Sequence, residues 1–202
     1  LYKSGVNRIS MGCQTFNDEI LKLINRRHSA NQVINAVNFL QDAGFGNISL
    51  DFIYGLPNQT LKSFVSDLET ADKLEIDHIS LYGLKIDEGC YFYKNPPKNI
   101  ANEDLQADMY LKAIETLDKN GFEHYEISNF ARKGKYSRHN INYWECGEYY
   151  GFGVAAHGYV NGTRYSNKNS IKKYLTEYNI PEEQYTITEL EWLEENIFLG
   201  LR

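Results

Sequence analysis

One stretch predicts a buried strand that ends at a proline: Asn47-Ile48-Ser49-Leu50-Asp51-Phe52-Ile53-Tyr54-Gly55-Leu56-Pro57. Apolar, β-branched and aromatic residues fill its centre, and its last residues are of the types that end strands. Two similar runs lie on either side of it, at 6–12 and 77–84, and helical patterns separate the three. Strands that alternate with helices predict parallel pairing, in a barrel or a doubly wound sheet, so the expected fold class is α/β.

The three strands are expected to be neighbours in chain order, joined by right-handed helical connections. Residues 6–12 are expected to form the edge of this sheet. The helices between the strands have start signals, because Ser29 and Thr60 are N-cap residue types placed directly before helical patterns.

Beyond residue 89 the alternation stops, and Asn95-Pro96-Pro97 marks a break in organisation. Residues 131–167 are expected to be loop-like, because they are rich in Gly, Asn and Tyr. The other elements expected here are a helix over 103–120, a strand over 124–130, a helix over 169–178 and a helix that follows Thr188.

Composition sets broad limits on the class of protein. The 202 residues carry a net charge of −6, which argues against a general nucleic-acid binder. No apolar run approaches the roughly 20 residues of a membrane-spanning helix. Three widely spaced cysteines fit a reducing cytoplasm better than a disulfide scaffold. The chain does not begin with Met, and a helical pattern continues into its last residue, so we expect it to be part of a longer protein.

Polar residues at the ends of the three predicted strands are candidates for a ligand site, because ligands of parallel α/β folds bind at the carboxyl ends of strands. These candidates are Gln14, Asp51, Tyr54, Tyr82 and Lys85. For Asp51 a second interpretation stays open, in which it faces solvent or caps a loop. Arg26 and Arg27 also have a structural interpretation, in which they complement the dipole of a helix C-terminus.

The segment Arg138-His139-Asn140-Ile141-Asn142-Tyr143-Trp144 has the densest set of functional residue types. A His in an aromatic setting is a candidate metal ligand, including for heme iron. The alternative is a His that only forms structural hydrogen bonds. The small-residue run 151–158 contains a competing ligand, His157. Six tyrosines form a set able to wall a flat aromatic ligand: Tyr136, Tyr143, Tyr149, Tyr150, Tyr159 and Tyr165.

Taken together, these motifs resemble the radical S-adenosylmethionine (SAM) family of oxygen-independent coproporphyrinogen III oxidases, and most closely its heme chaperone branch. The resemblance covers essentially the whole chain, in order. The segments that carry it are Arg8–Phe16, Asn25–Ser29, Asp51–Pro57, His78–Leu84, Glu103–Tyr110, His124–Ala131, His139–Trp144 and Gly151–Gly153.

The resemblance implies the C-terminal half of a partial, TIM-like (β/α)6 barrel over 1–94, with an α+β extension over 95–186 and the truncated start of a helical C-terminal domain over 187–202. A Cys-x3-Cys-x2-Cys loop that holds a [4Fe-4S] cluster is expected upstream of Leu1, so the cluster cysteines are absent from this chain. The residues implied to contact SAM are Gln14, Arg26, Asp51, Ile53 and Lys85.

The same resemblance implies that His139 and Tyr143 bind heme, with His139 as a ligand of the iron and His157 as its competitor. Two functions stay open: a heme chaperone, and a porphyrinogen oxidase that decarboxylates propionates in porphyrin biosynthesis. Residues 1–202 alone are expected to be inactive as an enzyme. The implied partners are heme or porphyrin and a heme-acceptor protein, for which association with a membrane stays open, and the implied location is the cytoplasm.

Overall fold

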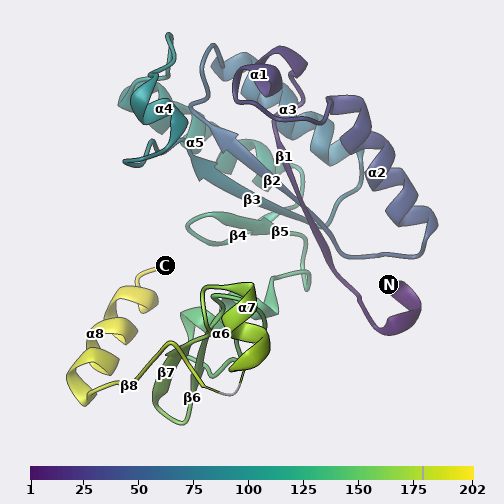
Figure 1. The fold of residues 1–202 in the computed structure, drawn as a ribbon. Helices are drawn as coiled ribbons and strands as arrows, with labels where there is room; N and C mark the ends of the chain where they lie inside the picture. The colour runs from purple at the N-terminus through teal and green to yellow at the C-terminus, as the bar shows by residue number, and fades with distance from the viewer. Residues whose placement is uncertain (179) are drawn as a thin grey trace. The chain divides into compact units, whose positions relative to one another are not determined.

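The computed structural model describes residues 1–178 and 180–202, which divide into two compact units, 1–136 and 137–202 (Figure 1). Each unit has a β-sheet of its own. The predicted three-part division, 1–94, 95–186 and 187–202, stays a prediction. No helix in the described ranges is long and apolar enough to cross a membrane.

The first unit contains a mixed five-stranded sheet. Its strands, in spatial order, are β1 (Ile9–Gln14), β2 (Ile48–Tyr54), β3 (His78–Gly83), β5 (Asn129–Ala131) and β4 (Glu123–Glu126). Strands β1, β2 and β3 pair in parallel in chain order, which confirms the expected α/β class and the order of these strands. As predicted, β1 lies at one edge of the sheet.

The single strand predicted over 124–130 is wrong, because this stretch folds into the β4–β5 hairpin. Strand β5 pairs antiparallel with β3, so the sheet is not purely parallel. The turn at 127–128 is closed by Glu126, whose carboxylate accepts hydrogen bonds from the Ser128 backbone N–H at 2.9 Å and from the Asn129 side chain. A side chain closes this turn without Gly or Pro, which explains why the sequence pattern did not indicate it.

Two helices of the first unit begin directly after the predicted caps Ser29 and Thr60. The elements are a 3₁₀ turn (Tyr2–Ser4), α1 (Asp18–Leu23), α2 (Ala30–Asp42), α3 (Leu61–Lys73), α4 (Tyr91–Lys94) and α5 (Glu103–Lys119). Ser29 and Thr60 both form capping boxes, each closed by the residue three positions later. In Figure 1, α2 and α3 run along one side of the sheet.

The core of the first unit lies on the helix-covered face of the sheet. Phe52 of β2 and Phe130 of β5 are fully buried there, with Val37 of α2, Phe64 of α3 and Met109 of α5. Because side chains alternate along a strand, the strand residues next to Phe52 and Phe130 point to the opposite face of the sheet. That opposite face is polar, and its paired strand positions include Ser10, Ser49, Asp51, His78, Ser80 and Asn129.

A buried carboxylate connects β1 to α3. Asp67 accepts hydrogen bonds from the Thr15 hydroxyl at 2.7 Å and from the Phe16 backbone N–H at 2.9 Å. Burial raises the pKa of Asp67 from its ordinary value of 3.8 to about 6, and the bonds from Thr15 and Phe16 act in the opposite direction. The folded state therefore keeps a proton between about pH 4 and 6 that the unfolded state releases.

This proton makes the folded state less stable as the pH rises through that window. In the wild type, Asp67 should make the free energy of unfolding fall by up to about 3 kcal/mol between pH 4 and pH 7. We expect Asp67→Asn to abolish this fall. Denaturant titrations at several pH values measure this. Asp118→Asn, on an exposed position of α5, is the matched control and should give a curve parallel to the wild type. A parallel curve for Asp67→Asn would contradict the prediction.

The second unit is built on a three-stranded antiparallel sheet, in the order β6-β7-β8. Its elements are α6 (Arg138–Trp144), β6 (His157–Val160), β7 (Thr163–Ser166), α7 (Ile171–Thr176), β8 (Glu183–Thr186) and α8 (Glu189–Gly200). The predicted helices near 169–178 and after Thr188 are confirmed, and Thr188 forms a capping box.

The expectation that 131–167 is loop-like is wrong, since α6, β6 and β7 all lie there. Strands β6 and β7 are joined at Asn161-Gly162, and both of these residues have positive φ, 51° and 71°. Asn-Gly between two short runs is the strongest local signal of a hairpin, because it suits a two-residue turn with left-handed φ. The signal was therefore present in the sequence, although the strands are only four residues long.

Candidate functional site

Gln14 occupies a strained position at the carboxyl end of β1. Its φ is 69°, an uncommon value for a residue other than Gly, and its side chain is buried. A Cβ on Gly12 would lie 2.6 Å from Gln14 Nε2, so the Gln14 side chain covers the backbone of Gly12. The parallel register shifts between these two residues. A local irregularity of this kind re-aims a side chain at the end of a strand.

Asp51 lies on the polar face of the sheet, next to Gly12 of β1 and Ser80 of β3 in the strand register. The Ser10 hydroxyl donates to Asp51 Oδ1 at 3.1 Å. Burial raises the pKa of Asp51, while hydrogen bonds from Ser80 and Ser10 and the charge of Arg8 act to lower it. Asp51 lies within β2, which contradicts the interpretation as a loop cap, and its role in a ligand site stays a prediction.

A cleft of about 690 Å³ opens beside the carboxyl ends of β2 and β3. Arg26 and Ile53 both line it, so the structure brings together two residues that are far apart in the sequence. Leu56 and Leu84 add apolar surface. Ile53 and Asp51 point to the same face of β2, because they are two positions apart on one strand.

The remaining strand-end candidates lie elsewhere. Lys85 is exposed and forms an ion pair with Asp87 at 3.0 Å. Tyr54 turns to the helix-covered face, where its ring centroid lies 6.2 Å from that of Phe64. Tyr82 is exposed. The ring contact with Phe64 shows that Tyr54 is part of the packing of the core.

A hydrogen-bonded chain of three side chains was not indicated by any sequence motif. The fully buried His78 contacts the Ser49 hydroxyl through Nδ1 at 2.8 Å and the Tyr125 hydroxyl through Nε2 at 2.7 Å. Burial, together with the charge of Arg8, lowers the pKa of His78 to about 3, so the ring is neutral at physiological pH. The three residues come from β2, β3 and β4, and only strand pairing brings them into contact.

In the second unit, His139 and Tyr143 lie one helical turn apart on α6. Their ring centroids are 4.7 Å apart and the planes are nearly perpendicular, at 89°. The His139 side chain is exposed, and no described residue hydrogen-bonds to it. A structural role for His139 through hydrogen bonds therefore has no support among the residues that the structure describes.

A row of aromatic rings continues from this pair. Tyr143 contacts Tyr149 with ring centroids 4.4 Å apart, and Tyr149 lies 6.5 Å from Tyr159. All three tyrosines line a cleft of about 310 Å³. The predicted aromatic wall is thus present for these three members of the Tyr set.

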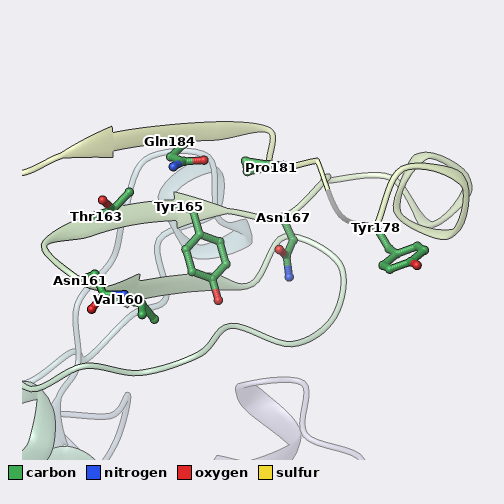
Figure 2. A pocket seen from close by; sticks show the side chains of 8 residues that line it. All are labelled: Val160, Asn161, Thr163, Tyr165, Asn167, Tyr178, Pro181 and Gln184. Carbon is green, nitrogen blue, oxygen red and sulfur yellow. The ribbon is translucent and has the colours of Figure 1, made fainter.

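The glycine-rich run 151–158 packs tightly on β6. A Cβ on Gly151 would lie 2.3 Å from the His157 carbonyl oxygen, so only Gly fits there. The loop is held by the Tyr165 hydroxyl, which accepts from the Gly151 N–H at 3.0 Å, and by Asn167 Nδ2, which donates to the Gly151 and Gly153 carbonyls. In Figure 2, Tyr165 and Asn167 point to the same side of the chain, within a pocket of about 390 Å³. This arrangement supports the tight-bend interpretation of the run.

His157, the competing ligand candidate, lies at the start of β6 with its side chain exposed. Among the residues that the structure describes, no three His, Cys, Asp or Glu side chains are grouped so as to hold a metal ion. A ligand role for either histidine therefore concerns a single axial contact.

Comparison with known proteins gives a consistent family. The model of the radical SAM superfamily matches residues 1–71. The protein named heme chaperone HemW of Lactococcus lactis is 44% identical over 100% of this chain and 55% of its own length, and that of Bacillus subtilis is 39% identical with the same coverage. The chain spans about half the length of the curated relatives it matches.

A solved structure has the same fold. Coproporphyrinogen III oxidase HemN from Escherichia coli, a radical SAM enzyme, superposes with a TM-score of 0.84 over 99% of this chain and 50% of its own, at 21% identity. The α/β architecture described above is therefore that of the matching half of this enzyme. Residues 1–71 match the radical SAM superfamily, and the chain is homologous over its whole length to the proteins named heme chaperone HemW.

Proposed function

We propose that residues 1–202 are part of a heme chaperone that binds heme through the second unit and SAM, together with a [4Fe-4S] cluster, through the first. The exposed His139, in ring contact with Tyr143 and free of hydrogen bonds from described residues, is the observation that carries this proposal. The names of the relatives, heme chaperone HemW, support the choice of ligand. In this proposal, strands β1, β2 and β3 form the later half of a (β/α)6 barrel.

The first unit has the features of half a SAM site. The cleft of about 690 Å³ combines the cationic Arg26 with the apolar Ile53, which suits the methionine carboxylate and the adenine. In this proposal Asp51 accepts hydrogen bonds from the ribose hydroxyls, Gln14 faces the methionine and ribose side, and Lys85 supplies a backbone contact. When bound beside a reduced cluster, SAM supplies a 5′-deoxyadenosyl radical, and the protein orients it. The cluster ligands are proposed to come from a Cys-x3-Cys-x2-Cys loop outside residues 1–202.

The second unit has the features of a heme-binding surface. A neutral imidazole is a common axial ligand of heme iron, and Tyr143 and Tyr149 offer flat apolar faces beside it. The proposal also includes transfer of heme to an acceptor protein and a location in the cytoplasm. The three free cysteines support a reducing location.

The test is a titration of the chain with ferric heme, followed by its Soret absorption band. A saturable band shift at one heme per chain is the expected result. The alternative function, a porphyrinogen oxidase, is tested with a longer form of the protein that includes the cluster-binding half. Anaerobic turnover of coproporphyrinogen III by that form, without saturable heme binding, would contradict the chaperone proposal.

Asp51→Ala is expected to weaken SAM binding at least about tenfold in the longer form. The physical reason is the loss of charge-assisted hydrogen bonds to the ribose, each of which contributes about 1.5–3 kcal/mol. Isothermal calorimetry measures the change, with Asp51→Asn as the isosteric intermediate and Asp118→Ala on α5 as a distant control. Equal affinity for SAM in Asp51→Ala and wild type would refute the ribose contact.

A further inference from the structure

The cleft of about 310 Å³ in the second unit has a polar end as well as an aromatic wall. Arg164 of β7 and Glu195 of α8 line it together with Trp144 and the three tyrosines Tyr143, Tyr149 and Tyr159. Arg164 Nη2 and Glu195 Oε2 form an ion pair at 2.5 Å, and the Arg164 guanidinium lies 5.5 Å from the centre of the Tyr159 ring. The Arg164 cation is therefore fixed at one side of this cleft, and a second guanidinium, that of Arg202, lies 3.9 Å from the centre of the Trp144 ring.

Two N–H groups of the residues lining this cleft have no acceptor. Arg164 Nε and Trp144 Nε1 are both buried, and neither has a hydrogen-bond partner among the residues described. Buried donors are nearly always satisfied in folded proteins, because leaving one without an acceptor costs free energy. Two unsatisfied donors on one cleft point to an acceptor that a ligand supplies.

The chemistry of the two donors selects the ligand group. A guanidinium presents N–H groups in a planar fork that matches the two oxygens of a carboxylate, and here Glu195 engages Nη2 while Nε stays free. The aromatic wall suits a flat apolar body attached to that carboxylate. Tyr143 connects the cleft to His139, because its ring contacts both His139 and Tyr149.

We propose that this cleft is a carboxylate subsite that receives a propionate arm of the porphyrin, and that Arg164 Nε and Trp144 Nε1 donate to it. This inference rests on the proposed function, because it takes the ligand to be a porphyrin. It assigns to Arg164 a binding role that no sequence motif indicated.

The test compares protoporphyrin IX with its dimethyl ester, which differ in the carboxylates alone. Both lack iron, so the comparison does not depend on His139. We expect the wild-type chain to bind the diacid at least about tenfold more tightly than the ester, measured by porphyrin fluorescence. Arg164→Gln should reduce this ratio to about twofold or less and leave the affinity for the ester unchanged.

Three further variants separate binding from structure. Trp144→Phe keeps an aromatic ring but removes the N–H, and it should lower the ratio of the affinities for the diacid and the ester several-fold. This variant keeps the proposal testable if Arg164→Gln does not fold. Glu195→Gln removes the ion pair and should keep or raise the ratio. Arg138→Gln is the matched control and should keep the wild-type ratio.

Several results would overturn the proposal. An equal loss of affinity for both porphyrins in Arg164→Gln would show a purely structural role, and an unchanged ratio would show no contact. Loss of the ratio in Arg138→Gln would place the carboxylate on α6. If the wild type bound neither porphyrin, this proposal and the proposed function would both fail. A normal diacid preference, with no effect of His139→Ala on the heme spectrum, would contradict only the iron-ligand assignment.

Discussion

Replacing His139 by alanine is expected to lower the affinity of the chain for ferric heme about 100-fold and to remove the Soret band shift of the bound form. The physical reason is the loss of the axial nitrogen, which Tyr143, one turn away on α6, does not replace with the same ligand field. No described residue hydrogen-bonds to the His139 side chain, so its removal should leave the fold intact. Absorption titrations with heme measure the affinity, and circular dichroism checks the fold.

His157→Ala is the matched control, because His157 is also exposed but lies at the start of β6. It should keep the wild-type affinity and spectrum. Tyr143→Phe should keep the band with a smaller loss of affinity, since the ring remains. If only His157→Ala lost the band, the axial ligand would be His157, and the assignment of His139 would be wrong.

The second large effect concerns stability. Phe52→Ala is expected to lower the free energy of unfolding of the first unit by about 3–5 kcal/mol. Phe52 is fully buried in β2, the strand between β1 and β3, and its ring lies 5.7 Å from that of Phe16. Truncation would remove buried apolar surface and leave a cavity that its neighbours fill only in part.

Phe39→Ala provides the control for the same chemical change on an exposed position. Phe39 of α2 is 71% exposed, so its truncation should change the free energy of unfolding by less than about 0.5 kcal/mol. Urea denaturation of both variants, followed by circular dichroism, measures the difference. Similar midpoints for Phe52→Ala and Phe39→Ala would contradict the position of Phe52 in the core.

The parallel part of the sheet was predictable because its signals are local. Each of β1, β2 and β3 is an apolar run, each intervening helix has a cap residue such as Ser29 or Thr60, and the hand of the connections follows from the twist of strands. The hairpin of β4 and β5 was not predictable in the same way. Its turn depends on the Glu126 carboxylate, and its antiparallel pairing with β3 depends on which strand edge is free in space.

The candidate site was also predictable from the sequence only in part. The resemblance to the radical SAM family was sufficient to nominate Gln14, Arg26, Asp51 and Ile53 for SAM, and His139 and Tyr143 for heme. That Arg26 and Ile53 line one cleft is a property of packing, since the two residues are 27 positions apart and meet only through the loop after α1 and the end of β2.

Sequence by itself determined the α/β class, the order of the parallel strands and the family, because hydrophobic period, caps and motif order are written along the chain. Tertiary structure alone decided three things: the Ser49, His78 and Tyr125 chain, the mixed sheet, and the unsatisfied donors of Trp144 and Arg164 beside an aromatic wall. Each of these depends on the meeting of elements that are far apart along the chain. Such meetings arise from strand register and from helix packing on the sheet, which no local pattern specifies.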